Sequence, residues 1–231
     1  MTRRKRANGR GEETRGRILD AAERLIAAEG YATVSLRRIT HAAGANVAAV
    51  NYYFKSKHAL LEAIFVRRIV PINAERMRLL DEALALPDTG TARLEAVVRA
   101  FVEPHLRLTR EFGPGGTVVM QLLGRLSTDP EGRIEKLLLK QYDPIWRRFA
   151  AAFRALLPHL GKAAVYWRFY YLLGALYYLS SARQWLPRRS ERLCDPGNVD
   201  EAIESLIPFL VGALTAPDAD PAKRKPRAGR A

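Results

Sequence analysis

The sequence predicts an all-α protein with two helical domains, and three observations lead to this. Apolar residues recur at helical spacing along almost the whole chain, and no stretch alternates as a strand does. Turns that contain glycine or proline separate the apolar stretches. The content of hydrophobic residues (48%) and of charged residues (27%) is that of an ordinary globular protein, so the middle of the chain is expected to fold.

The first three helices follow from stop and start signals. The apolar stripe that begins at Thr14 ends at Gly30, a residue suited to the end of a helix. Ser35 is the expected N-cap of a second, two-turn helix that Gly44 ends. Asn46 is then the expected N-cap of a third helix with the sequence "VAAVNYYF". The N-terminal domain is therefore a small bundle of short helices.

A longer apolar-periodic segment begins at Lys57, and Pro71 is expected to break or kink its helix. The linker "LPDTGT" follows. Further helices are predicted between Gly- and Pro-rich turns, over about 91–112, 116–127, 131–158, 162–186 and 198–215. These helices form the larger, C-terminal bundle.

The positive charge lies mainly at the two ends of the chain. The net charge is +14, and residues 1–57 hold 12 Lys or Arg against 5 acidic residues, while residues 217–231 hold 5 against 2. Basic ends are typical of proteins that bind polyanions, with nucleic acid favoured over an anionic membrane. Residues 1–12 are expected to be a disordered basic arm and residues 216–231 a disordered basic tail, since neither can bury enough apolar surface. The arm either enters a DNA groove or only aids solubility.

Cofactor and enzyme chemistry find no support in the residues. Cys194 is the single cysteine, so the chain can form neither an internal disulfide nor a cysteine-based zinc site, which fits a reducing compartment. The four histidines are scattered, and no HExxH pair or nucleophile motif is present. No apolar segment follows the basic N-terminus, so it is not a secretory signal. We expect a non-enzymatic protein without cofactor or metal.

The second and third helices have the spacing of a helix-turn-helix, the motif that places its second helix in the major groove. Val47, Ala48 and Ala49 keep the outer face of that helix slim, so it can approach the bases. Small apolar side chains can contact a thymine methyl, and Asn51 can read adenine or bind phosphate. Polar and basic residues nearby suit phosphate contacts or cap the helices: Ser35, Arg37, Arg38, Asn46, Tyr52, Tyr53, Lys55 and Lys57.

The stretch "TVSLRRITHAAGANVAAVNYYFKSKHALLEAIF" resembles the DNA-binding signature of the TetR family of bacterial transcriptional regulators. The residues that carry the resemblance are Gly30-Tyr31, Ser35, Ile39, Ala43-Gly44, Tyr53-Phe54, Ser56-Lys57 and Leu60. Asn46 stands where the family usually has Ser, and it can cap the helix equally well. Asn51 stands where a Tyr is common, which puts the phosphate contact of that Tyr in doubt. The "VNYYF" form resembles the PsrA-like branch, which is associated with fatty acids or acyl-CoA.

The resemblance implies a DNA-binding domain at 13–60 and an effector-binding and dimerisation domain at 61–215. It also implies a ligand-responsive repressor that binds a palindromic operator as a homodimer. Aromatic-rich helices favour an apolar or amphipathic effector such as a fatty acid or acyl-CoA. Arg107, Arg110 or Arg168 could meet an acidic head group. The candidate pocket residues, for which ordinary core is the alternative, are Phe101, His105, Met120, Trp146, Phe149 and Tyr170.

The segment 163–182 has one charge in 20 residues, so a membrane-spanning helix has to be weighed against a buried one. Its aromatic residues lie near the middle instead of in two interfacial belts, which favours a dimer seam over a membrane. We expect helices 162–186 and 198–215 to form that seam. The main alternative to a regulator is an architectural DNA-binding protein with little sequence preference and no effector.

Overall fold

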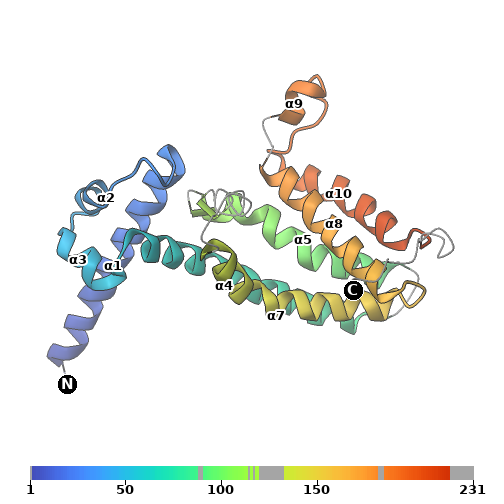
Figure 1. The fold of residues 1–231 in the computed structure, drawn as a ribbon, viewed down its shortest axis with the longest axis horizontal. Coiled ribbons are helices and arrows are strands. Elements are labelled where there is room, and N and C mark those ends of the chain that lie inside the picture. The colour runs from blue at the N-terminus through green and yellow to red at the C-terminus, as the bar shows by residue number, and fades with distance from the viewer. Residues whose placement is uncertain are drawn as a thin grey trace, which may run out of the picture.

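The computed structural model describes residues 2–87, 91–113, 115–116, 118–119, 133–181 and 185–218, and within these ranges it contains helices and no strand. The predicted all-α class is therefore confirmed. A small group of helices at the N-terminal end is joined by one long helix to a larger bundle, so the molecule is elongated (Figure 1).

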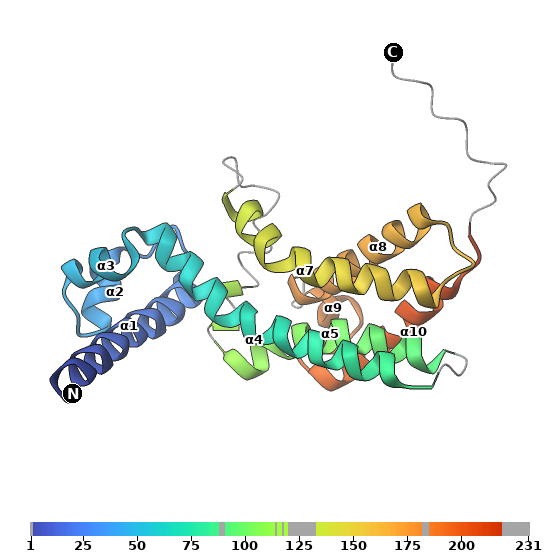
Figure 2. The same cartoon turned by 90° about the horizontal axis from the view of Figure 1, so that it is seen from below.

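The N-terminal group consists of α1 (Thr2–Glu29), α2 (Leu36–Ala42) and α3 (Val47–Phe54). Their apolar faces share one core with the first half of the next helix; its fully buried members include Ile18, Ile39, Val50, Leu60 and Ile64. Figure 2 shows α1 extending past α2 and α3 at its N-terminal end.

The first twelve residues differ from the expectation of a disordered arm, because α1 already begins at Thr2. Arg and Lys are good helix formers, and no proline interrupts this segment, so helical propensity allows α1 to continue toward the N-terminus. The basic segment is thus an extension of α1.

Helix α4 (Lys57–Ala85) connects the two domains without a break. Ser56 caps its first turn by accepting a hydrogen bond from the backbone N–H of Ala59 at 3.0 Å. Of the expected break or kink at Pro71, the break is wrong, because α4 continues through that residue. Pro71 is exposed, so water can solvate the backbone carbonyl that lacks its helical partner. The boundary placed at residue 60 therefore falls inside one helix.

The C-terminal bundle contains α5 (Ala92–Phe112), α7 (Arg133–Leu156), α8 (Lys162–Ser181), α9 (Trp185–Arg189) and α10 (Val199–Thr215). Helix α4 packs on α5 and α7, while α10 packs on α5 and α8. Of the expected helix 162–186, α8 covers the part up to Ser181 and α9 begins at Trp185, while 182–184 lie outside the described residues. The expected helix 116–127 and tail 216–231 lie almost wholly outside the described residues.

Candidate functional site

The helix-turn-helix is held in shape by caps that the sequence predicts. The Ser35 hydroxyl accepts a hydrogen bond from the Arg38 backbone N–H at 3.3 Å, and the Asn46 side chain accepts one from the Ala48 N–H at 3.0 Å. Gly44 adopts a φ of +58° between the two helices, a conformation that glycine tolerates best. Ser35 and Asn46 thus orient α2 and α3.

The two faces of α3 differ as a recognition helix requires. Val50 and Phe54 are buried against the core, which fixes the orientation of the helix. The outer residues Ala48, Asn51 and Tyr52 are exposed, and Tyr52 is 77% accessible. Val47 is also exposed, and Ala49 is half-buried. The predicted base-reading face therefore lies on the molecular surface.

Basic and aromatic side chains follow the C-terminal end of α3. Lys55 ends the helix with a φ of +65° and is exposed. Tyr53 is half-buried, and its ring meets that of Tyr52 edge-on at 5.0 Å. Lys57 Nζ donates a hydrogen bond to the Tyr31 carbonyl oxygen and lies 4.3 Å from the centre of the Tyr31 ring. Burial lowers the pKa of Lys57. Lys57 thus ties the loop after α1 to α4, with two N–H groups left for another acceptor.

The two arginines of α2 have different surroundings. Arg38 forms a bidentate ion pair with Glu29 of α1, and one of its two hydrogen bonds measures 2.8 Å. The hydrogen bonds and charge of Glu29 raise the pKa of Arg38. Arg37 is exposed, and among the described residues no ion pair is found for it. Arg37 is therefore better placed than Arg38 to contact DNA phosphate.

A buried ion pair joins the DNA-binding end to the C-terminal bundle. Glu23 of α1 is only 3% exposed, and its carboxylate accepts two hydrogen bonds from Arg68 of α4, the Nε one at 2.9 Å. Arg67 Nη1 lies 3.6 Å from the same carboxylate and donates to Asp20 at 2.6 Å. A Cβ at Gly115 would lie 2.7 Å from Glu23 Oε2, so the backbone beyond α5 packs directly on the pair. Three parts of the fold thus meet at Glu23.

The predicted pocket residues separate into inner and outer ones. Phe101, His105 and Phe149 are buried in the C-terminal core, and Trp146 is half-buried, stacked on Phe169 with ring centres 4.1 Å apart. Placing Tyr170 with them is wrong, because its side chain is 64% exposed on the outer face of α8. Met120 lies outside the described residues.

Sequence reasoning missed the most unusual core residue, Arg76 of α4, which is 1% exposed. Its Nε donates to the Phe101 carbonyl oxygen at 3.0 Å, and its Nη1 donates to Asn73 Oδ1 at 3.3 Å. The signal was present, since Arg76 lies on the same helical stripe as the buried Ile69, Ile72 and Leu80. A charged residue in a core position is a candidate for function.

Two of the arginines that were expected to bind the acidic head group of an effector have other partners in the structure. Arg168 donates to the backbone carbonyls of Leu214, Ala216 and Pro217, and so it caps the end of α10. Arg107 pairs with Asp200 at 3.1 Å. The side chain of Arg110 lies outside the described part of the chain.

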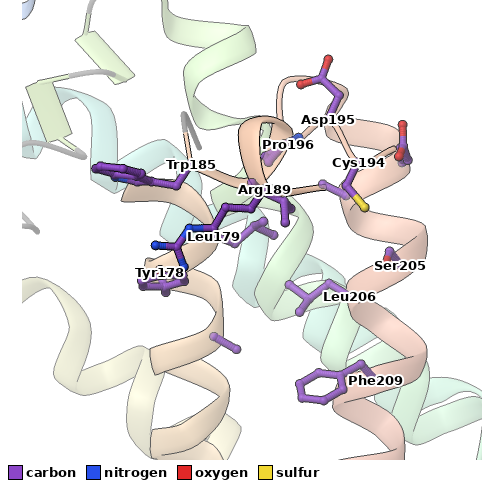
Figure 3. A pocket seen from close by; sticks show the side chains of 14 residues that line it. Tyr178, Leu179, Trp185, Arg189, Cys194, Asp195, Pro196, Ser205, Leu206 and Phe209 are labelled. Atoms are coloured by element: carbon purple, nitrogen blue, oxygen red, sulfur yellow. The ribbon is translucent and has the colours of Figure 1, made fainter. Parts of the chain in front are cut away.

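Exposed aromatic residues mark one face of the C-terminal bundle, on α8 and α10. Trp167, Tyr171, Tyr178 and Phe209 are each more than half accessible. A groove of about 640 Å³ lies on this face between α8, α9 and α10; Tyr178, Trp185, Leu206 and Phe209 are among its lining side chains (Figure 3). So much apolar surface is typical of a protein interface.

Two kinds of feature are absent from the described residues. No helix there is both long and apolar enough to span a membrane. No group of His, Cys, Asp or Glu side chains in the same ranges could hold a metal ion.

An exposed second helix in a helix-turn-helix, joined to a helical bundle, defines the class of helix-turn-helix regulators. Comparisons with known proteins then identify the family. The model for bacterial regulatory proteins of the tetR family matches residues 18–64, and that for a tetracycline repressor-like C-terminal domain matches residues 99–213. The chain belongs to the TetR family of transcriptional regulators. This confirms the resemblance to the TetR family and the expectation of a non-enzymatic protein, while the PsrA-like branch stays a prediction.

Two curated relatives come from Pseudomonas putida. The HTH-type transcriptional regulator SrpR is 33% identical over 103 residues, which cover 44% of this chain and 44% of SrpR. TtgW, an uncharacterized HTH-type transcriptional regulator of the same species, is also 33% identical over 103 residues, covering 44% of this chain and 70% of TtgW. The match to SrpR thus spans less than half of that protein.

Solved structures share the fold at lower identity. SmeT, solved as a complex with triclosan, has a TM-score of 0.60 and 21% identity, and the match covers 89% of this chain and 96% of SmeT. The fatty acid degradation regulator FadR from Bacillus halodurans has a TM-score of 0.58 and 16% identity, covering 86% and 95%. At these identities the likeness shows the fold alone.

Proposed function

We propose that the protein is a ligand-responsive repressor that binds a palindromic operator as a homodimer, in the cytoplasm on the nucleoid. The observation that carries this proposal is the contrast between the two faces of α3. Its inner face is fixed by the buried Val50 and Phe54, while its outer face presents Ala48, Asn51 and Tyr52 to solvent. A rigid helix with a slim exposed face is what entry into the major groove requires.

The exposed residues divide by chemistry into two roles. Val47, Ala48 and Asn51 are proposed to contact base edges, because small apolar groups and an amide can read thymine and adenine. Arg37 and Lys55 are exposed cations, and they are proposed to contact phosphates that fix the register. Tyr52 and Tyr53 extend this phosphate-facing rim, and Lys57 joins it with its two remaining N–H groups.

Dimerisation is proposed to use the aromatic face of α8 and α10. A second copy of the same chain can cover Trp167, Tyr171 and Phe209 symmetrically, as homodimer interfaces require. The dimer would place two copies of α3 about one turn of DNA apart, roughly 34–36 Å, on the two halves of a palindrome.

We propose that an apolar or amphipathic effector binds at the aromatic core of the C-terminal bundle. The rings of Phe101, Phe149 and Phe169 lie in contact there, with Phe101–Phe149 centres 4.9 Å apart. SmeT, a structural neighbour, was solved as a complex with triclosan, and we propose that this chain likewise binds a small apolar or amphipathic molecule.

The test is a selection of binding sites from random DNA, followed by measurement of affinity and stoichiometry. We expect an inverted repeat bound by two chains. Ala48→Leu should abolish the preference for that site, because a larger side chain holds α3 away from the bases. Ala28→Leu, at an exposed position near the end of α1, is the matched control and should bind normally. Equal binding of selected and random DNA, unchanged by Ala48→Leu, would favour the architectural alternative.

A further inference from the structure

Arg76 is a positive charge in the middle of the protein. It lies on α4 at the junction of the two hydrophobic cores, since Tyr142 beside it packs against the N-terminal core and Phe101 belongs to the C-terminal one. The centre of the Phe101 ring is 4.5 Å from the guanidinium carbon, and that of Tyr142 is 5.7 Å away. Among the described residues, no carboxylate forms an ion pair with Arg76.

The hydrogen bonds of Arg76 leave most of its donors unused. Of its five N–H groups, one donates to the Phe101 carbonyl and one to Asn73 among the described residues. Asn73 is itself held by a hydrogen bond from its Nδ2 to the Gln141 carbonyl at 2.8 Å, so its oxygen faces Arg76. A buried cation without an anionic partner is unfavourable, and such a charge is kept where something else compensates it.

The polar groups around Arg76 are neutral. The Tyr142 hydroxyl is buried, and no hydrogen bond of ordinary geometry reaches it. Burial raises the pKa of Tyr142, while the charge of Arg76 and the nearness of its N–H groups to the hydroxyl act in the opposite direction. Burial and then the charge of Arg76 lower the pKa of His105 to about 3, so this ring is uncharged at neutral pH. His105 Nε2 lies 3.2 Å from Ser180 Oγ. The cluster therefore carries one positive charge.

The single positive charge of Arg76 and the planar arrangement of its N–H donors indicate which kind of anion could bind it. A carboxylate is planar, carries a single negative charge and accepts two parallel hydrogen bonds from a guanidinium. A phosphate monoester or coenzyme A would bring at least one further charge, and none of the contacts of Arg76 with the described residues is to a second cation. The remainder of the molecule would lie among the buried rings of Phe101 and Phe149, which contact each other edge-on and would have to separate to admit it.

We propose that Arg76 binds the carboxylate of an amphipathic organic acid, with Asn73 and the Tyr142 hydroxyl beside it, and that this acid is the effector. The inference rests on the proposed function and narrows its ligand class from fatty acid or acyl-CoA to the free acid. It also moves the head-group role from Arg107, Arg110 and Arg168 to Arg76.

Calorimetric titration of the full-length protein in chloride-free buffer tests the site. The probes are decanoate and 2-naphthoate, each compared with its neutral amide, together with decyl phosphate. We expect wild type to bind at least one acid roughly 10- to 100-fold more tightly than its amide, the size of effect of hydrogen bonds to a charged group. Arg76→Met should abolish this preference. Arg107→Met, which removes the same charge from the surface of the bundle, should retain it.

Three outcomes would overturn the proposal: no preference of wild type for either acid over its amide, a preference that persists in Arg76→Met, or tighter binding of decyl phosphate than of decanoate. A thermal unfolding scan separates a binding role from a structural one. Without ligand, Arg76→Met should unfold at the same or a higher temperature than wild type, since a buried unpaired charge is removed. A lower midpoint would assign Arg76 to the fold and overturn the proposal.

Failure of the proposed function would look different. If wild type binds the acid more tightly than its amide, Arg76→Met abolishes this preference, and the protein selects no DNA sequence, then the ligand site is supported and the proposed repressor function is overturned. If it selects an operator whose affinity the bound acid leaves unchanged, the effector role is overturned, because a ligand regulates only by binding two states unequally.

Discussion

Replacing Arg68 with Met tests whether the Glu23–Arg68 pair holds the DNA-binding domain to the bundle. The Glu23 side chain is 4% exposed and that of Arg68 17%, so the variant leaves a carboxylate buried without its bidentate partner. Loss of one member of a buried pair costs about 3–5 kcal/mol. Arg67 remains 3.6 Å from Glu23 and compensates part of the charge, so we expect the lower end, about 3 kcal/mol.

The assay is urea unfolding of the protein at neutral pH, with protein concentration held constant because a dimer dissociates as it unfolds. Arg78→Met is the matched control on the same helix. Arg78 pairs with Glu75 and Glu82, but it is 53% exposed, so its loss should cost at most about 1 kcal/mol. The reasoning is refuted if the Arg68 variant loses no more stability than the Arg78 variant.

A double variant isolates the pair itself. Combining Glu23→Gln with Arg68→Met removes both charges, so much of the loss seen for Arg68→Met should be recovered. Additive losses would show that the two side chains act independently, against the contacts seen here.

Three further predictions concern DNA, pH and assembly. Lys57→Ala should reduce the magnitude of the slope of log affinity against log salt concentration by roughly 0.9, because one phosphate is no longer neutralised. The sequence preference should stay unchanged, and an altered preference at constant slope would contradict the phosphate role. Burial lowers the pKa of His105 to about 3, so the folded protein takes up no proton at this ring between pH 6.5 and 3, whereas the unfolded chain does. The free energy of unfolding should therefore fall by up to roughly 1.4 kcal/mol per pH unit as pH drops through this window. In His105→Asn, urea unfolding should show a smaller slope over that window, and an unchanged slope would exclude the buried neutral ring. Tyr170→Glu, at an exposed position on α8, should shift light scattering from dimer to monomer, while Tyr52→Glu on α3 should leave the dimer intact; a dimeric Tyr170 variant would place the interface elsewhere.

The N-terminal part of the fold was predictable because its signals are local. Ser35 and Asn46 each cap a helix through a hydrogen bond to a residue two or three positions ahead, and both caps are confirmed. Gly44 has the positive φ that ends the short helix before it. Such contacts depend on neighbouring residues, so they can be read before the fold is known.

The effector region was less predictable because its contacts join distant segments. Arg76 contacts Phe101 on α5 and Tyr142 on α7. No pattern in the sequence around residue 76 predicts these contacts. Helix α8 has aromatic side chains on both faces, so periodicity could not separate the buried Phe169 from the exposed Tyr170. Spacing therefore selected the exposed Tyr170 for the pocket and left out the buried Phe169.

Helix α4 connects the proposed ligand site to the DNA-binding end by a short rigid path. Arg76 and Arg68 are eight residues apart, about 12 Å along the helix, and both project from it toward buried partners. If the bound acid shifts α4, it also shifts Arg68, which holds Glu23 of α1. Since coupling between two binding equilibria is reciprocal, operator DNA must then weaken acid binding by the factor by which the acid weakens operator binding. Titrating the acid with and without operator, and the operator with and without the acid, measures both factors in wild type and in Arg68→Met. The two factors should agree within each protein and should be smaller in the variant, and an equal factor in the variant would show that the coupling does not pass through the Glu23–Arg68 pair.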